Sequence, residues 1–269
     1  MKLTALREYQ IYENVQGYSK HYPGFIRYYR YENPVKMRVS GYEERGLKPR
    51  TKSNYIDPAS LLVSLRRTKT TISDIVICNN FEIFVTFTFK SDRQDILKCK
   101  RKMSKWLKNQ KERVGSFSYL IVPEFHKDGK SLHFHALIKG YQGKLVDSGK
   151  RINGRRAFNL KSYKLGFSSA VYIDDHAKVS SYVRKYITKD MPQFNNKKRF
   201  WCSTGLARPQ IVRNPQIMHE DLRDECVVWR TENLTVFEFR ETISLPLTAI
   251  RSTTWQRNKK LARTTQLQT

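Results

Sequence analysis

A pair of histidines separated by one residue, within an apolar segment, constrains the fold and chemistry of this chain more than any other feature. Residues 131–140 read SLHFHALIKG, in which His133 and His135 flank a phenylalanine. Residues two apart in a β-strand point to the same face of the sheet, while their neighbours point to the other. The segment therefore predicts a strand with both imidazoles on one face and apolar side chains on the reverse.

A β-hairpin places a carboxylate next to these histidines. The alternating run SFSYLIVPEF, residues 116–125, is joined to the histidine segment by HKDGK. An Asp-Gly pair between two alternating runs is the strongest short-range signal for a hairpin. With Asp and Gly as the loop residues, Glu124 lies directly opposite His133, and opposed residues share a face at about 5 Å between their Cβ atoms. Glu124, His133 and His135 are thus expected to converge, with His126 as a rival third ligand nearer the turn.

The residue types in this patch are those of a metal site. Two neutral imidazoles and one carboxylate form a mixed nitrogen and oxygen donor set that suits Mn²⁺ or Mg²⁺ and leaves positions open for a phosphate oxygen. Zn²⁺ also fits the ligand types. The alternative is that both histidines are ordinary structural residues that share a face by accident. The carboxylate opposite them favours the metal site.

The charge of the chain indicates a polyanionic partner. Its 269 residues hold 51 Lys and Arg against 24 Asp and Glu, a formal net charge of +27. Such an excess attracts nucleic acid strongly and with marked salt dependence. A basic protein without enzymatic activity would carry the same charge. A membrane partner is not expected, because the N-terminal residues lack an apolar signal core and no run of about 18 apolar residues occurs.

The four cysteines show no metal-binding or disulfide pattern. Cys78, Cys99, Cys202 and Cys226 form no CxxC pair and no spacing typical of a zinc site. A chain of this length buries a sizeable core without such staples. We therefore expect plain structural cysteines in a reducing compartment, the cytoplasm.

The remaining patterns predict an α+β fold, with a central antiparallel β-sheet flanked by helices. FVTFTF, residues 84–89, alternates β-branched and aromatic side chains as a central strand does. Residues 91–115 have helical apolar spacing, with Ser91 or Asp92 as the expected cap and Gly115 as the stop. The opposite face of this helix is densely basic, either because it is solvated or because it lies along a phosphate backbone.

A second predicted helix carries tyrosines next to lysines. Asp174 or Asp175 is expected to begin it and Pro192 to end it. Spacings of three and four put four residues on adjoining positions of one helical side, namely Tyr182, Lys185, Tyr186 and Lys189. A tyrosine is a weak nucleophile, and a neighbouring lysine both favours the phenolate and can meet a phosphate oxygen. The alternative is that Tyr186 simply packs with the apolar stripe of its helix.

The metal patch and the tyrosine helix complement each other chemically. A divalent ion that polarises a phosphodiester, together with an attacking tyrosine, is the equipment for cutting DNA by transesterification through a covalent phosphotyrosine. The net positive charge suits the same substrate.

Three regions are predicted along the chain. Residues 1–57 are expected to form a basic N-terminal arm or subdomain, residues 58–210 the catalytic domain, and residues 211–269 a C-terminal extension with a basic tail. Within the catalytic region, an Asn-Gly pair in RINGRRAF predicts a second hairpin, rich in arginine. That ribbon and the tail could both hold DNA.

Three of these motifs occur in the order that a known family shows. FVTFTF at 84–89, HFH at 133–135 and YVRKYITK at 182–189 together resemble the motifs of the HUH endonucleases. The resemblance is to the rolling-circle replication initiators (Rep) of plasmids and of single-stranded DNA phages and viruses. It covers roughly residues 60–210, and WCSTGLARP after the tyrosine motif is similar to the plasmid and phage branch.

The resemblance implies roles for the residues of both patches. It implies a ferredoxin-like or RRM-like antiparallel core with the metal on the histidine strand. The implied metal ligands are His133, His135 and Glu124. Tyr186 resembles the nucleophile of single-tyrosine initiators, with Lys189 and Lys185 as companions. The spacing Tyr182-x-x-x-Tyr186 also resembles initiators that alternate two tyrosines, so Tyr182 is a candidate second nucleophile.

The implied reaction nicks one strand at a replication origin, leaves a 5′-phosphotyrosine and a free 3′-OH, and rejoins the ends at termination. A host polymerase would extend the 3′-OH, and a host helicase would unwind the duplex because no GxxxxGK[ST] loop is present. The implied substrate is single-stranded or hairpin DNA at the origin, in the cytoplasm of a bacterial host. The basic residues expected to contact it are Lys100, Arg101, Lys105, Arg151, Arg155, Arg156, Lys197 and Lys198.

Other functions remain as alternatives. A transposase or mobilisation relaxase would use the same residues on other DNA ends. A non-catalytic origin-binding protein or repressor would retain the fold and bind DNA without joining to it. A nucleotide hydrolase with a longer histidine triad would need a histidine at position 137, where this chain has leucine.

Overall fold

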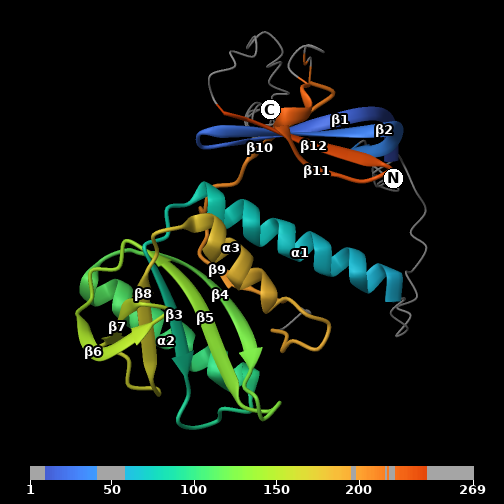
Figure 1. Cartoon of the computed structure of the whole chain (residues 1–269). Helices are drawn as coiled ribbons and strands as arrows, with labels where there is room; N and C mark the ends of the chain where they lie inside the picture. Colours follow the sequence, from blue (N-terminus) through green and yellow to red (C-terminus); the bar gives the residue numbers. More distant parts are fainter. Residues whose placement is uncertain (1–9, 41–57, 195–197, 216, 218–221, 241–269) are drawn as a thin grey trace, which may run out of the picture.

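The computed structural model describes residues 10–40, 58–194, 198–215, 217 and 222–240 (Figure 1). Within these residues the chain forms a seven-stranded and a five-stranded antiparallel sheet together with α-helices. The predicted α+β fold with antiparallel sheets is therefore confirmed.

The seven-stranded sheet holds the histidine strand near its centre. Its strands, in chain order, are β3 (Ile83–Thr88), β4 (Ser118–Phe125), β5 (Leu132–Lys139), β6 (Leu145–Ile152), β7 (Arg155–Leu160), β8 (Ser168–Tyr172) and β9 (Trp201–Cys202). Their order across the sheet is β6-β7-β8-β3-β5-β4-β9. The histidine strand β5 thus lies between β3, which carries FVTFTF, and β4, which carries the carboxylate.

Helices cover both faces of this sheet (Figure 1). They are α1 (Pro58–Cys78), α2 (Ile96–Val114) and α3 (His176–Lys185). The apolar reverse of β5, including Phe134 and Ala136, packs against Met103 of α2. On the other face, Leu137 belongs to a separate buried cluster with Ile72 of α1 and Val183 of α3. The histidines of β5 therefore point to the face that α1 and α3 cover.

Both Asp-Gly and Asn-Gly signals form the hairpins that the sequence predicts. In the β4–β5 hairpin Glu124 pairs with His133, so the expected register is confirmed. In the β6–β7 hairpin Ile152 pairs with Arg155 across the Asn-Gly turn. Both turn residues there have positive φ, 48° at the asparagine and 79° at the glycine, as this turn type requires.

The helix after β3 begins later than the sequence suggested. We expected Ser91 or Asp92 to cap it, but α2 begins at Ile96 and its N-cap is Asp95. The Asp95 carboxylate accepts hydrogen bonds from the backbone N–H groups of residues 97 and 98, both at 2.9 Å. Asp92 cannot be helical because its φ is +55°. The predicted stop at Gly115 is confirmed.

The tyrosine helix is shorter than expected. Asp175 caps its start, as one of the two predicted alternatives, but α3 ends at Lys185 rather than near Pro192. The last turn tightens to bonds three residues apart, from Tyr186 N–H to the Val183 carbonyl and from residue 187 to residue 184. Tyr186 is the C-cap, so Lys189 lies in a turn beyond the helix and not on the helical side that the spacing predicted.

The segments near the two chain ends form the five-stranded sheet. Its strands are β1 (Gln10–Tyr22), β2 (Phe25–Ser40), β10 (Gln210–Arg213), β11 (Val227–Arg230) and β12 (Leu234–Arg240), in the order β10-β1-β2-β12-β11. A 3-10 turn (Asp224–Cys226) precedes β11. The expectation of an irregular arm is wrong for residues 10–40, which form a long hairpin, whereas a small subdomain fits them. The boundaries at 57 and 210 remain predictions, and residues 1–9, 41–57 and the basic tail 241–269 lie outside the described residues.

A buried ion pair joins the smaller sheet to α1. The ammonium group of Lys20 on β1 lies 2.7 Å from a carboxylate oxygen of Asp74. The Tyr22 hydroxyl donates a 2.7 Å hydrogen bond to the other oxygen of that carboxylate. Lys20 is only 5 % exposed, so Asp74 neutralises a charge that the fold has removed from water.

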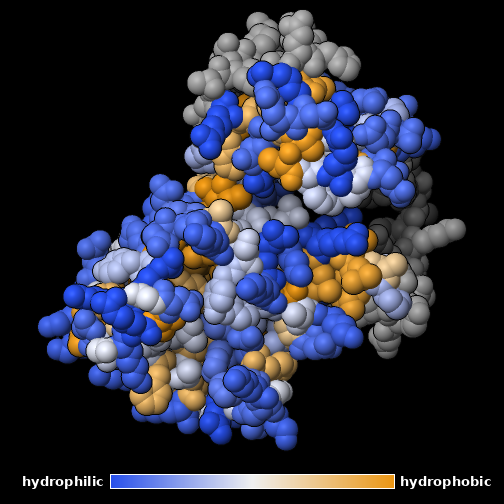
Figure 2. All heavy atoms as spheres, viewed as in Figure 1, coloured by the Kyte–Doolittle hydropathy of each residue, from blue (hydrophilic) through white to orange (hydrophobic). Residues whose placement is uncertain are grey.

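The surface is mainly hydrophilic, as the net charge suggests. Figure 2 shows hydrophobic patches interrupting it at the level of α1, where Leu62 and Val63 are exposed. Among the described helices, none combines the length and the apolarity that crossing a bilayer requires.

Candidate active site

Glu124, His133 and His135 meet on the face of the sheet under α3. The carboxylate of Glu124 lies 2.6 Å from Nε2 of His135, and one ligand atom from each of the three residues lies within 4.8 Å of the others. These three residues, here called the triad, come from the paired strands β4 and β5. The convergence follows from the hairpin register, as the sequence predicted.

The rival ligand His126 lies beside the triad rather than within it. Its ring packs edge-on against His133, with the centroids 4.7 Å apart. Unlike His135, which is almost fully buried, His126 is exposed near the hairpin tip. The order of preference between Glu124 and His126 therefore agrees with the geometry.

A threonine on the neighbouring strand orients His135. Thr86 of β3 pairs with His135, and its hydroxyl lies 3.2 Å from Nδ1 of the imidazole. Contacts of this kind fix the ring orientation and tautomer of metal-binding histidines. With Nδ1 held by Thr86, Nε2 faces Glu124 and the centre of the triad.

The donor set fits a divalent cation. Burial lowers the pKa of His133, and the neighbouring imidazoles of His126 and His135 lower it further. This favours the neutral form, which is the form that binds metals. Two imidazole nitrogens and a half-buried carboxylate match Mn²⁺ or Mg²⁺, and they also match Zn²⁺, so the residues support a metal without identifying it.

Both tyrosines of the α3 region lie over the triad. The Tyr186 ring stacks on the imidazole of His135, with 3.9 Å between the centroids and 4° between the planes. Tyr182 stands edge-on to Tyr186 at 5.3 Å and also contacts Phe84 of β3. Tyr186 is half-buried and borders the apolar cluster under α3, so the packing alternative describes part of its surroundings. It does not explain a phenol stacked on a triad histidine.

The surroundings of Tyr186 oppose ionisation. Burial raises the pKa of its hydroxyl above the ordinary value, and Tyr182 and Glu124 raise it further. This is the opposite of the effect expected from a neighbouring lysine. Lys185 lies instead with its ammonium group 5.7 Å from the centroid of the Tyr182 ring, and Lys189 is exposed beyond the helix.

The basic residues expected to contact DNA are spread over several surfaces. Lys100, Arg101 and Lys105 lie on α2, which covers the face opposite the triad. The Lys100 ammonium is held over the rings of Phe194 and Trp201, at 5.4 and 5.7 Å. The structure therefore does not bring these three residues together with the triad.

The arginines of the second hairpin also lie away from the triad, at the edge of the sheet formed by β6 and β7. Arg151 and Arg156 are exposed, and Arg155 pairs with Asp174 at 2.6 Å. Lys198 is exposed, and Lys197 lies outside the described residues.

Sequence reasoning missed two features beside the triad. One is Thr86, whose place opposite His135 depends on the pairing of β3 with β5 across 49 residues. The strand alternation of FVTFTF gave its face but not its partner. The other is a cavity beside His133 that is also lined by Lys90, Arg93 and Phe167. Its lining comes from three separate loops, and no local pattern marks it.

Comparison with protein families gives one match. Residues 82–191 match the family described as Replication-associated protein ORF2. No curated protein and no solved structure matches the chain. The matched segment runs from β3 through α3 and contains the triad and both tyrosines. Through residues 82–191, this chain belongs to the Replication-associated protein ORF2 family, a family of rolling-circle replication initiators.

Proposed function

We propose that this protein initiates replication by nicking one strand of origin DNA through metal-dependent transesterification. The observation that carries the proposal is the stack of Tyr186 on His135, because it puts a phenol directly against a divalent-cation donor set. The family match supports a role in replication initiation, and the net charge of +27 supports DNA as the substrate.

The reaction exchanges one phosphodiester for another. The Tyr186 oxygen forms a bond to phosphorus while the bond from phosphorus to the 3′ oxygen breaks. The phenolic proton ends, in net balance, on the departing 3′ oxygen. The products are a 5′-phosphotyrosine and a free 3′-OH that a host polymerase can extend, after a host helicase has opened the duplex. A divalent ion bound by the triad would polarise the phosphodiester.

The two tyrosines have different surroundings and therefore different proposed roles. Tyr186 stacks on the triad and is half-buried, which suits the first nucleophile. Tyr182 is 41 % exposed, contacts Tyr186 and has Lys185 over its ring. We assign Tyr182 to a second exchange, in which the strand ends are rejoined at termination. Lys185 and Lys189 are exposed cations near this helix end, where they can meet the phosphate backbone.

The test uses a supercoiled plasmid that carries this gene with its flanking DNA. With Mn²⁺, the wild-type protein should convert supercoiled DNA to open circles that carry covalently bound protein. Tyr186→Phe should lose nicking, and Tyr182→Phe should keep it but lose rejoining. The readouts are gel mobility before and after protease treatment.

DNA binding by the Tyr182→Phe/Tyr186→Phe double variant provides the control. It should bind the same DNA as tightly as wild type, because only hydroxyl groups are removed. If wild type forms no covalent adduct with any divalent ion while binding persists, the chain is a non-catalytic origin-binding protein or repressor.

A further inference from the structure

A cavity opens beside the triad, where β3 ends and β5 begins. Its volume is about 340 Å³, and its lining includes Thr88, Lys90, Arg93, His126, His133 and Phe167. A volume of this size is in the range of small-molecule sites, roughly 300–1,000 Å³. His133 belongs both to this cavity and to the triad, so a ligand in the cavity is continuous with the proposed nicking site.

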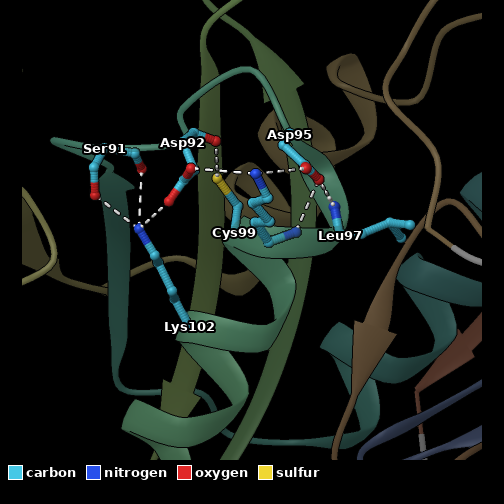
Figure 3. Close-up of polar contacts among 7 residues, drawn as sticks. Ser91, Asp92, Asp95, Leu97, Cys99 and Lys102 are labelled. Carbon is cyan, nitrogen blue, oxygen red and sulfur yellow. Dashed lines mark hydrogen bonds and ion pairs between the residues drawn. The ribbon is translucent and has the colours of Figure 1, made fainter.

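The loop that supplies Lys90 and Arg93 is held rigidly. Figure 3 shows the Lys102 ammonium between Ser91 and Asp92, with 2.7 Å to the serine hydroxyl. The Cys99 thiol donates to the Asp92 carbonyl at 3.2 Å. The Arg93 carbonyl accepts a 2.7 Å hydrogen bond from the backbone of residue 132, next to the triad strand. This wall of the cavity is therefore formed before any ligand binds.

The opposite wall presents an aromatic ring on an equally fixed backbone. Phe167 is 84 % exposed, the most exposed of the large apolar side chains described. Its backbone N–H donates to the Thr88 hydroxyl, and its carbonyl accepts from the Thr88 N–H, both at 2.9 Å. A Cβ added at the preceding Gly166 would lie 2.2 Å from the Thr88 carbonyl oxygen, so only glycine permits this close approach. The ring is thus displayed by a backbone that has little freedom.

The charge of the cavity favours an anion. Lys90 and Arg93 are exposed cations at its rim. The carboxylate of Asp128 also lies in the lining, but its oxygens accept hydrogen bonds from the backbone N–H groups of residues 130 and 131 and from the Ser131 hydroxyl. Asp128 therefore braces the hairpin tip, while the two cations are left to meet a ligand.

We propose that this cavity binds one unpaired nucleotide of the DNA strand, with its base stacked on Phe167 and its phosphate held by Lys90 and Arg93. An exposed aromatic ring next to fixed cations is the arrangement by which proteins hold single-stranded nucleic acid. In a duplex the face of a base is already stacked, so the ring selects unpaired DNA. That the bound strand continues to the scissile phosphate at His133 rests on the proposed nicking function.

The experiment measures binding of fluorescein-labelled decathymidylate by fluorescence anisotropy. The protein is the full chain carrying Tyr182→Phe and Tyr186→Phe, in EDTA, so no chemistry contributes. Phe167→Ala should weaken binding about tenfold, and Phe167→Trp should restore it. The variants should fold normally, because the ring is exposed and the hydrogen bonds to Thr88 come from the backbone.

Tyr172→Ala is the matched control. Tyr172 is an exposed aromatic residue, 56 % accessible, at the other end of β8, and its loss should leave affinity unchanged. Lys90→Gln and Arg93→Gln should each reduce the slope of log affinity against log salt by about 0.7, whereas Phe167→Ala should not change that slope. Binding of a fully paired duplex should not depend on Phe167.

The outcomes separate this inference from the nicking function. Equal affinities of the Phe167→Ala and Tyr172→Ala variants for decathymidylate would overturn the nucleotide pocket, even if wild type still forms adducts with origin DNA. Conversely, a Phe167-dependent loss of binding together with a wild type that never joins to DNA supports the pocket and contradicts the nicking function.

Discussion

His135 is the residue on which the chemistry of the site depends. Thr86 holds one nitrogen of its ring, Glu124 contacts the other, and Tyr186 covers its face. A buried imidazole with both nitrogens engaged and a phenol on its face has little rotational freedom. A metal bound at this histidine would therefore lie directly beside the proposed nucleophile.

Removing triad ligands should abolish metal binding, whereas removing the rival histidine should not. His135→Ala and Glu124→Ala should eliminate detectable Mn²⁺ binding in isothermal titration calorimetry, because each takes away one of three donors. Thr86→Val should weaken it on the order of 10- to 100-fold through loss of ring orientation.

His126→Ala is the matched control for the metal measurement, because His126 packs on His133 but lies outside the triad. It should keep Mn²⁺ affinity close to that of wild type. Strong loss in His126→Ala with retention in Glu124→Ala would instead make His126 the third ligand.

At the scale of elements, the start of α2 fixes the loop that forms one wall of the nucleotide pocket. Asp95→Ala removes the N-cap and should lower the free energy of unfolding by about 1 kcal/mol. Ser91→Ala, at the position that sequence alone suggested as the cap, should change it by less than about 0.5 kcal/mol, as surface substitutions usually do. Urea denaturation of both variants measures the difference, and a larger loss in Ser91→Ala would contradict the observed helix start.

Local signals predicted the elements that local forces determine. The Asp-Gly turn fixed the register of β4 and β5, and with it the position of Glu124 opposite His133. The end of α3 was not predictable from spacing, because Tyr186 leaves the helix to stack on a histidine 51 residues earlier in the chain. The start of α2 was mistaken because three polar residues could each have capped it.

At the scale of the whole molecule, the smaller sheet was beyond sequence reasoning for a similar reason. β2 pairs with β12 across about two hundred residues, for example at Arg27 and Glu238. No short-range turn marks such a pairing, so the N-terminal residues showed no pattern that identified their partner. The cavity lining likewise comes from loops that only the complete fold brings together.

The contact between the smaller sheet and α1 should contribute strongly to stability. Asp74→Ala leaves the buried ammonium of Lys20 without its counter-charge and should lower the free energy of unfolding by about 3–5 kcal/mol. Replacing both partners by apolar residues, Lys20→Met with Asp74→Leu, should recover much of that loss because no buried charge remains unpaired.

Chemical denaturation with urea measures both variants of this ion pair. The Arg230 and Asp224 pair, whose side chains are largely exposed, supplies the comparison, and Asp224→Ala should cost less than about 1 kcal/mol. Similar small losses in Asp74→Ala and Asp224→Ala would show that the smaller sheet does not depend on the buried pair.

The central claim is that a tyrosine over the metal triad becomes joined to DNA, and mass spectrometry of the joined peptide tests it most directly. The wild-type protein is incubated with Mn²⁺ and the supercoiled plasmid, then digested with nuclease and protease. We predict a nucleotide attached through phosphate to Tyr186, and none in the Tyr182→Phe/Tyr186→Phe double variant. An adduct on a residue outside the 182–186 segment, or no adduct with either Mn²⁺ or Mg²⁺, would contradict the account.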